Sequence, residues 1–191
     1  PGPMSQPPDT PARLASLPAI EAACWAELSR ATQHPGHAWR QTTLATVDGE
    51  HADARIVILR EVQAGARQLV FFTDDRSPKL AQIRLNPNGT LLMWSRLLGW
   101  QLRLRVQLEA LSDGLAVSSR WARMKLSPAA QDYLSSSAPG TPLSEPSTEP
   151  GARPYFTVVT ATVQRMDWLE LHPEGHRRAL FDAEGARWVQ P

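Results

Sequence analysis

In the segment from Trp100 to Leu111, apolar and polar side chains alternate as far as Ala110, and this pattern constrains the fold more than any other stretch of the chain. In an extended strand, one face would carry Leu102, Leu104, Val106 and Leu108, and the other would carry Arg103, Arg105, Gln107 and Glu109. A strand with one dry and one wet face is typical of antiparallel sheets. We therefore expect an antiparallel sheet with a solvated face.

Further short apolar runs, bounded by turn residues, predict more strands and few helices. We expect one helix from Leu14 to about Ala31 and a second from Ser118 to Ser135, with a break at Pro128. Many short strands with few helices indicate a small barrel closed on itself. The other predicted strands are Gln41 to Thr46, Ala54 to Val62, Gln68 to Thr73, Thr90 to Ser95, Tyr155 to Leu171, His176 to Phe181 and Ala186 to Val189.

The length of 191 residues leaves room for one well-buried core, so we expect a single domain over residues 14–191. Residues 1–13 are rich in proline and polar groups and begin with what resembles an expression scar, which predicts a flexible arm. Prolines recur through residues 138–154 and predict a surface loop, with a mobile flap as the alternative to a plain connection.

Twenty basic and nineteen acidic residues give a formal charge of +1, which does not favour nucleic acid or an anionic membrane as a partner. Cys24 is the single cysteine, and its place on an apolar helical stripe predicts a buried structural thiol. No histidine is spaced with Cys, Asp or Glu as in a metal site, and no apolar run resembles a membrane span. These features predict a cytoplasmic protein without a metal.

Between Phe72 and Lys79, an apolar strand passes through a polar turn into the start of a helix. Ser77 fits the N-cap position and Pro78 the first helical position. Free N–H groups and the positive end of the helix dipole favour an anion at such a point. Lys79 departs from the preference for acidic residues in the first turn of a helix. A bound phosphate would explain this lysine, because it would compensate the positive charge. A solvated lysine on a short surface helix is the alternative.

Arg55 and Arg60 are five residues apart and so face opposite sides of a straight strand. Only one of them would enter a given pocket unless the strand bends or ends. A guanidinium fork suits phosphate, although surface charges at a sheet edge are the alternative. Gln101 lies on the polar face of its strand, where its amide could read the mixed edge of a heterocycle.

Near the C-terminus, Trp168 and Arg178 could bracket a planar ring. His176 lies between them in sequence and could manage a proton near neutral pH, or it could be an exposed turn residue.

Taken in order, these pieces resemble the FMN-binding split β-barrel of the pyridoxamine 5′-phosphate oxidase family. The resemblance spans roughly residues 35–191 and is closest to an uncharacterised FMN-binding subgroup. It implies a mainly β, antiparallel, Greek-key-like split barrel with peripheral helices. The segments that carry it are Arg55 to Arg60, Phe71 to Thr73, Ser77 to Leu80, Asn86-Pro87, Trp94, Trp100 to Leu102, and Trp168 through Arg178.

By this resemblance, FMN would bind at the interface of a homodimer, and the redox chemistry would belong to the flavin. Arg55 and Lys79 would hold its phosphate. The groups that approach its ring, in part from the second subunit, would be Gln101, Trp168 and Arg178. The implied cofactor residues are Arg55, Ile56, Val57, Ile58, Arg60, Phe72, Thr73, Ser77, Lys79, Gln101, Trp168 and Arg178, and the implied substrate residue is His176.

Departures from the family's pattern concern the substrate. The B6 oxidase grips its substrate phosphate with a lysine, a tyrosine, an arginine, a serine and a C-terminal Arg-x-His. Because the central arginine is lost and Glu174 is gained, we expect poor binding of a dianion and a different substrate or a reductase-like role. The residues found at the corresponding positions are Arg60, Arg120, Met124, Pro128, Glu174 and His176.

The leading hypothesis is thus a homodimeric FMN flavoprotein, an oxidoreductase of unassigned substrate. A rival is a protein that stores or senses a flavin or haem on the same barrel without turnover. A third is a small barrel that binds single-stranded nucleic acid through aromatic side chains, Arg103 and Arg105, against which the near-zero net charge argues.

Overall fold

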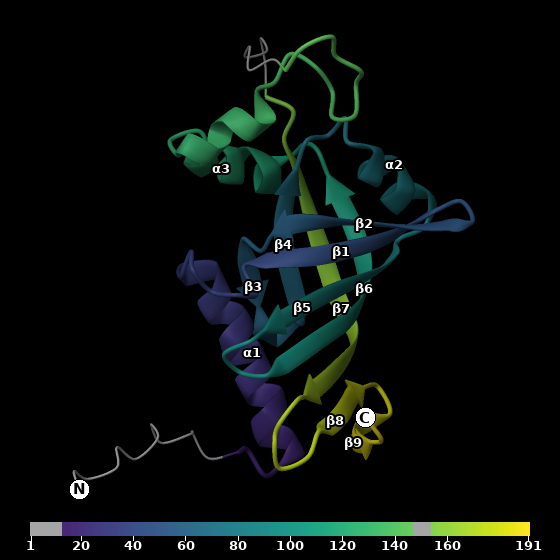
Figure 1. The fold of residues 1–191 in the computed structure, drawn as a ribbon. Coiled ribbons are helices and arrows are strands. Elements are labelled where there is room, and N and C mark those ends of the chain that lie inside the picture. Colours follow the sequence, from purple (N-terminus) through teal and green to yellow (C-terminus); the bar gives the residue numbers. More distant parts are fainter. Residues whose placement is uncertain (1–12, 147–153) are drawn as a thin grey trace, which may run out of the picture.

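The computed structural model describes residues 13–146 and 154–191 (Figure 1). The predicted arm, except for residue 13, and part of the predicted 138–154 loop therefore lie outside the described residues. The elements are α1 (Leu17–Gln33), β1 (Gln41–Asp48), β2 (His51–Ile58), β3 (Glu61–Gln63), η1 (Ala64–Ala66), β4 (Gln68–Thr73), α2 (Pro78–Leu85), β5 (Asn88–Ser95), β6 (Trp100–Leu111), α3 (Leu115–Met124), η2 (Pro128–Tyr133), β7 (Thr157–Glu170), β8 (Arg177–Asp182) and β9 (Gly185–Val189).

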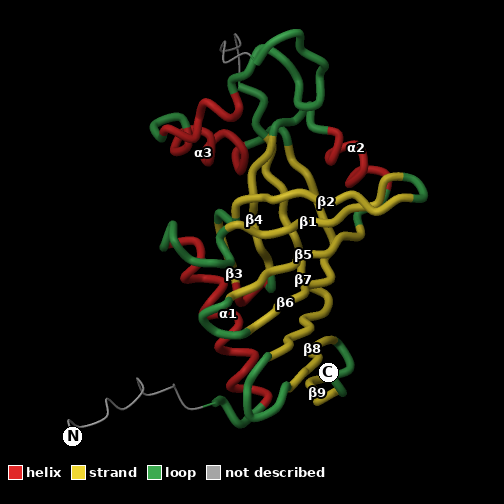
Figure 2. Tube along the Cα trace, viewed as in Figure 1, coloured by secondary structure: helices red, strands yellow, loops and turns green. Residues whose placement is uncertain are grey.

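The strands form one sheet in the order β2-β1-β5-β6-β7-β4-β3, and β8 and β9 extend it from β7. Every pairing is antiparallel. Figure 2 shows that the described helices lie around the sheet: α1 runs along one side, and α2 and α3 lie near one end. The prediction of a mainly β, antiparallel fold with peripheral helices is confirmed.

Strand β6 has the predicted alternation. Its side chains are buried at Leu102, Leu104, Val106 and Leu108, and they are exposed at the intervening positions from Arg103 onward. The strand lies between β5 and β7, and its buried side chains belong to the hydrophobic core.

One predicted strand, Ala54 to Val62, is in fact two. Strand β2 ends at Ile58, and β3 begins at Glu61. Between them the backbone changes partners: the N–H of Leu59 donates to the carbonyl of Arg40, and the N–H of Arg60 donates to the carbonyl of Val70. Arg55 and Arg60 therefore belong to different parts of the sheet.

Helix α1 covers the core with one apolar stripe that includes Ile20, Cys24 and Leu28. Cys24 is fully buried, as predicted, and burial raises the pKa of its thiol far above the ordinary range. The predicted break at Pro128 is also present, because α3 ends at Met124 and η2 begins at Pro128.

Candidate functional site

Lys79 is held by two hydroxyls at the junction of β4 and α2. Its Nζ donates to Oγ1 of Thr73 over 2.8 Å and to Oγ of Ser77 over 2.7 Å. Thr73 is the last residue of β4, and Ser77 is the N-cap of α2. The Ser77 side chain makes no capping hydrogen bond, so its hydroxyl and the start of α2 lie beside the ammonium.

Arg55 reaches the same region from β2. Its Nη1 donates to Oγ1 of Thr46 over 2.7 Å, and its Nη2 donates to Oδ2 of Asp53 over 2.6 Å and to Oε1 of Gln82 over 3.1 Å. Gln82 is a buried residue of α2 that also accepts from Thr46 and donates to Asp53. These bonds tie the guanidinium to α2.

The electrostatics of this cluster favour an anion. The pKa of Lys79 is lowered, first by burial and then by the positive charge of Arg55, while Asp74 and Asp53 act in the opposite direction. Asp74 is itself paired with Arg76 at 2.7 Å. An ammonium, a guanidinium, hydroxyls and a helix start are the donors that phosphate uses in proteins, so the residues present fit a phosphate group. We call Arg55, Thr73, Ser77 and Lys79 the cationic cluster.

Strand β2 offers a free backbone edge beside this cluster. It is the end strand of the sheet and pairs with β1 alone in the described chain. Ile56 is 59% exposed, whereas Val57 is buried. Unpaired N–H and C=O groups along residues 56–58 could therefore contact a flat polar heterocycle.

Gln101 and Arg178 lie on the wet face of the sheet, on strands that flank β7. Gln101 pairs with Leu169 of β7, and Leu169 pairs with Arg178 of β8. Asp167 fixes Arg178 with bonds of 2.9 and 2.8 Å and also accepts from Arg103. Burial alone would raise the pKa of Asp167, but hydrogen bonds from the two arginines outweigh it, so the pKa is lowered.

Two predicted residues do not join these groups. Trp168 is 0% exposed: it pairs with Leu102 on the dry face and packs against Trp100 and Trp188. A fully buried side chain has no surface to offer a ring, so we no longer assign Trp168 to the cofactor. His176 lies exposed in the β7–β8 turn, where its Nδ1 accepts from the N–H of His172.

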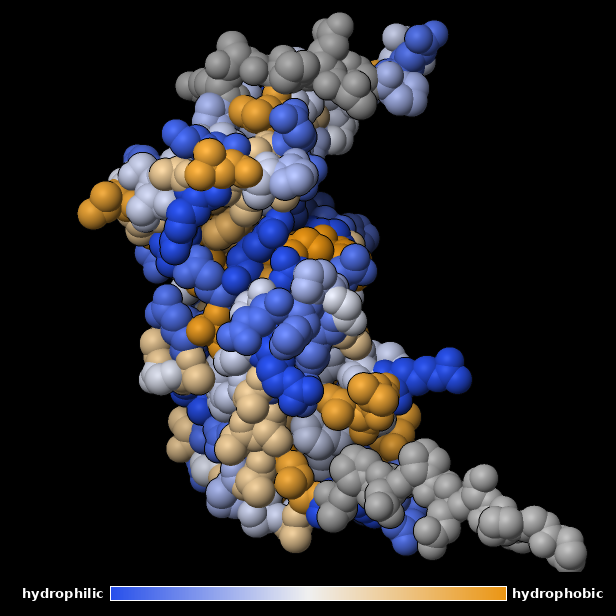
Figure 3. All heavy atoms as spheres, turned by 90° about the vertical axis from the view of Figure 1, so that its left-hand side faces the viewer, coloured by the Kyte–Doolittle hydropathy of each residue, from blue (hydrophilic) through white to orange (hydrophobic). Residues whose placement is uncertain are grey.

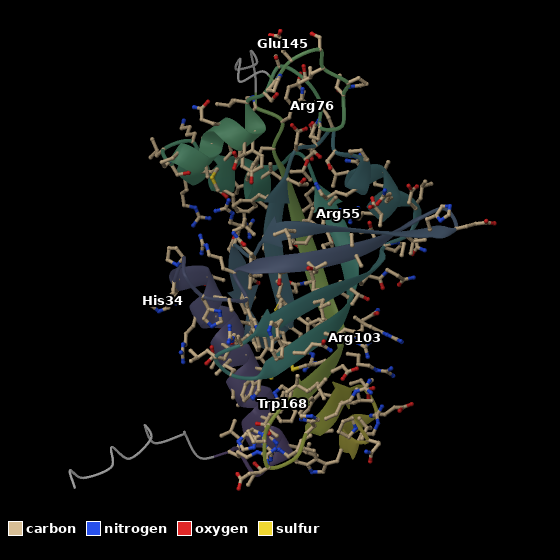
Figure 4. The ribbon with its side chains drawn as sticks, in the orientation of Figure 1. His34, Arg55, Arg76, Arg103, Glu145 and Trp168 are labelled. Atoms are coloured by element: carbon tan, nitrogen blue, oxygen red, sulfur yellow. The ribbon has the colours of Figure 1, made fainter. Side chains whose placement is uncertain are left out.

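Most of the predicted cofactor residues thus form two groups within one chain. Figure 4 shows Arg55 on the side of the molecule near α2, and Arg103 and Trp168 toward the end formed by β8 and β9. The cationic cluster and the wet-face pair of Gln101 and Arg178 are therefore separate in this chain.

Arg60 and Phe72 belong to neither group. They line a cavity of about 360 Å³ that also contains Arg120 and Met124, two of the positions aligned with the family's substrate residues. Glu174 is not part of it, because its side chain is 79% exposed in the β7–β8 turn. The full lining is Arg40, Arg60, Glu61, Phe72, Arg120, Arg123, Met124 and Ser127.

Sequence reasoning missed several residues of these sites. Gln82 and Thr46 look like ordinary polar residues, and only the packing of α2 against β1 brings them to Arg55. The sequence could have indicated Arg123 as a site residue, because it follows Arg120 by three residues and so shares a helix face with it. Arg40 carried none, since only the fold places it beside α3.

Among the described residues, no group of His, Cys, Asp and Glu side chains is arranged to hold a metal ion. The helices of that part of the chain also lack the length and apolar character that crossing a membrane requires.

Comparisons with known proteins agree with this fold. Residues 22–112 match the family described as pyridoxamine 5′-phosphate oxidase, FMN-binding domain. A pyridoxamine 5′-phosphate oxidase-related, FMN binding protein from Nostoc punctiforme PCC 73102 is 26% identical, with a TM-score of 0.70 over 88% of this chain and 96% of that chain.

Two further solved structures share the fold at lower identity. PhzG from Burkholderia lata 383, in complex with tetrahydrophenazine-1-carboxylic acid, is 16% identical, with a TM-score of 0.70 over 93% of this chain and 94% of that chain. A putative pyridoxamine 5′-phosphate oxidase from Listeria innocua is 17% identical, with a TM-score of 0.51 over 77% of this chain and 95% of that chain. The search of curated proteins found no match.

Proposed function

Because the chain belongs to the pyridoxamine 5′-phosphate oxidase-like family of split barrels, we propose that it is a homodimeric FMN flavoprotein and an oxidoreductase. The bound flavin would supply the redox chemistry. The protein's residues would bind the flavin, orient it and select what reaches it.

The observation that carries this proposal is the cationic cluster. Lys79 and Arg55 are close enough for the charge of Arg55 to lower the pKa of Lys79, and the hydroxyls of Thr73 and Ser77 already converge on Nζ of Lys79. A phosphate there would accept from the hydroxyls, the ammonium and the N-terminus of α2. The free edge of β2 would then run along the flavin ring.

The homodimer is supported by the wet face of the sheet. In the strand register, Thr43 of β1 lies between Ile56 of β2 and Leu92 of β5, which are 59% and 39% exposed. Trp94, 45% exposed, pairs with Gln101 on the same face. A second copy packed there would cover this apolar surface and bring its own wet-face groups toward the first copy's flavin.

The decisive experiment compares FMN with riboflavin, which lacks the phosphate. Flavin-free protein titrated by fluorescence quenching should bind FMN at least about 100-fold more tightly than riboflavin, since charged hydrogen bonds to phosphate contribute several kcal/mol. Lys79→Ala should remove most of that preference by weakening FMN alone. Lys125→Ala removes the other lysine, which is exposed, and serves as the matched control.

Equal affinity for the two flavins, or an unchanged preference in Lys79→Ala, would contradict the assignment. If the protein binds haem but no flavin, the alternative hypothesis of a storage or sensing protein is favoured. Once FMN is bound, anaerobic mixing with pyridoxamine 5′-phosphate or a nicotinamide nucleotide separates an enzyme from a carrier. Bleaching of the visible absorbance of the flavin would report reduction by a donor.

A further inference from the structure

The cavity beneath α3 is strongly cationic. Four arginines and one carboxylate, that of Glu61, line its volume of about 360 Å³, which is the size of a small organic molecule. Figure 3, viewed from the side of α1 and α3, shows strongly hydrophilic side chains gathered just below α3. Figure 4 shows side-chain nitrogens between α3 and β3.

Two of the four guanidinium groups are held by a carboxylate or by a backbone carbonyl. Arg120 pairs with Glu61 over 2.6 Å and also donates to the carbonyl of Ala116. Arg40 donates to the carbonyl of Thr32 at the end of α1, which fixes its position but leaves its charge without a carboxylate.

The other two have no acidic partner among the described residues. The guanidinium of Arg60 hydrogen-bonds the side chain of Tyr133 and lies 5.8 Å from the centre of the Phe72 ring, but its Nε is buried and has no hydrogen-bond partner. Arg123 is exposed at the rim on α3, with no ion pair in the described part of the chain. A buried unpaired donor is costly, so an external acceptor would stabilise the site.

The character of the lining selects the kind of anion. Glu61 lies in the same cavity and occupies the guanidinium of Arg120, which leaves fewer guanidinium donors free for an anion. The two oxygens of a carboxylate match one guanidinium fork. Phe72 and Met124 supply the apolar contacts that the body of an organic acid would need.

We propose that this cavity binds the carboxylate of a small organic acid through Arg60 and Arg123, with Phe72 and Met124 against its apolar body. The inference deepens the proposed function by naming the substrate class, and it rests on that function, because Arg60 follows by two residues the β2 edge assigned to the flavin. Met124 stands where the family's pattern has its central arginine. Arg40 and Arg123 replace the positive charge that this position has lost.

The test uses benzoate, its neutral analogue benzamide, and phenyl phosphate in calorimetric titrations of the FMN-loaded protein. Benzoate should bind at least tenfold more tightly than benzamide. Arg123→Ala should weaken benzoate at least fivefold, and Glu61→Gln should strengthen it, because a repelling charge is gone. Arg30→Ala, an exposed arginine on α1 with a 60% exposed side chain, is the control and should change nothing.

Equal binding of benzoate and benzamide would overturn the proposal, as would no effect of Arg123→Ala. Phenyl phosphate binding more tightly than benzoate would show that the site prefers a dianion and would overturn the carboxylate class. If FMN itself does not bind, the proposed function fails. The same titrations on flavin-free protein then still decide whether the carboxylate site exists.

Discussion

The side-chain oxygen of Gln82 on α2 accepts a hydrogen bond from Nη2 of Arg55 on β2 over 3.1 Å. The same oxygen accepts from the hydroxyl of Thr46 over 2.6 Å, and the amide nitrogen donates to Asp53. Gln82 is only 7% exposed, so water offers little competition for these bonds. The arginine is therefore oriented by the fold before any anion arrives, which lowers the entropy lost on binding.

Gln82→Met keeps the length of the side chain and removes its polar atoms. We expect FMN affinity to fall about 5- to 30-fold, or about 1–2 kcal/mol, because Arg55 loses an orienting partner. Riboflavin affinity should stay the same, since riboflavin has no phosphate to meet Arg55. Fluorescence titration with both flavins measures this split. Gln107→Met, on the exposed face of β6, is the control, and equal weakening of both flavins would mean that Gln82 acts only on the fold.

Cys24 should be chemically silent in the native protein. The pKa of its thiol is raised, first by burial and then by the negative charges of Glu21 and Glu27, so thiolate is scarce at neutral pH. A chromogenic disulfide reagent should therefore release no colour at pH 8 until denaturant is added, and then one equivalent. Rapid stoichiometric reaction without denaturant would contradict the buried structural role.

Much of the fold was predictable because period-2 alternation and turn residues mark strands directly. β4 and β6 have the predicted bounds, since each is bracketed by polar or glycine-containing turns. The break between β2 and β3 was not predictable, because the apolar run from Ile56 to Leu59 contains no turn residue. Only the backbone of residues 40 and 70 shows why the strand ends there.

The candidate site was predictable where the chemistry is local in sequence. Thr73, Ser77 and Lys79 lie within seven residues at a strand end and a helix start, so their meeting follows from capping rules. Trp168 could not be placed, because the face of a strand depends on register. Its pairing with Leu102 turns it into the core, while its neighbour Asp167 faces the arginines.

Glu170 ties the N-terminal residue of the described chain to the end of β7. Its carboxylate accepts from Arg13 and Arg177, both at 2.9 Å from Nε, and from the indole of Trp100. Burial alone would raise the pKa of Glu170, but the hydrogen bonds from Arg177 and Arg13 outweigh it, so the pKa is lowered in the folded protein.

A carboxyl whose pKa is lowered by folding stabilises the protein above its unfolded pKa, about 4.3, and loses that contribution as pH falls through the lower folded value. We expect Glu170→Gln to reduce the free energy of unfolding by about 1–3 kcal/mol at pH 7 and by less near pH 3. Urea denaturation at both pH values measures the difference. Glu184→Gln, 81% exposed, should change little at either pH, and a loss for Glu170→Gln that is independent of pH would argue against ionisation as the cause.

Gly99, in the turn between β5 and β6, has no room for a side chain. Its φ is +66°, and an added Cβ would lie 2.6 Å from the carbonyl oxygen of Leu171. The two residues are also bonded, because the N–H of Leu171 donates to the carbonyl of Gly99 over 2.8 Å, so the backbone cannot move away without losing that bond. Left-handed strain and the close contact act together, and we expect Gly99→Ala to cost about 2–4 kcal/mol.

For a chain of this length, such a loss corresponds to a fall in Tm of about 4–15 °C in differential scanning calorimetry. Gly36→Ala is the matched control, since an added Cβ there meets nothing within 4 Å and φ is not positive. It should stay within about 0.5 kcal/mol of the parent. Because the turn holds Trp100 and Gln101 against the end of β7, Gly99→Ala should also weaken FMN and riboflavin alike, whereas a change confined to FMN would mean that Gln101 does not face the ring.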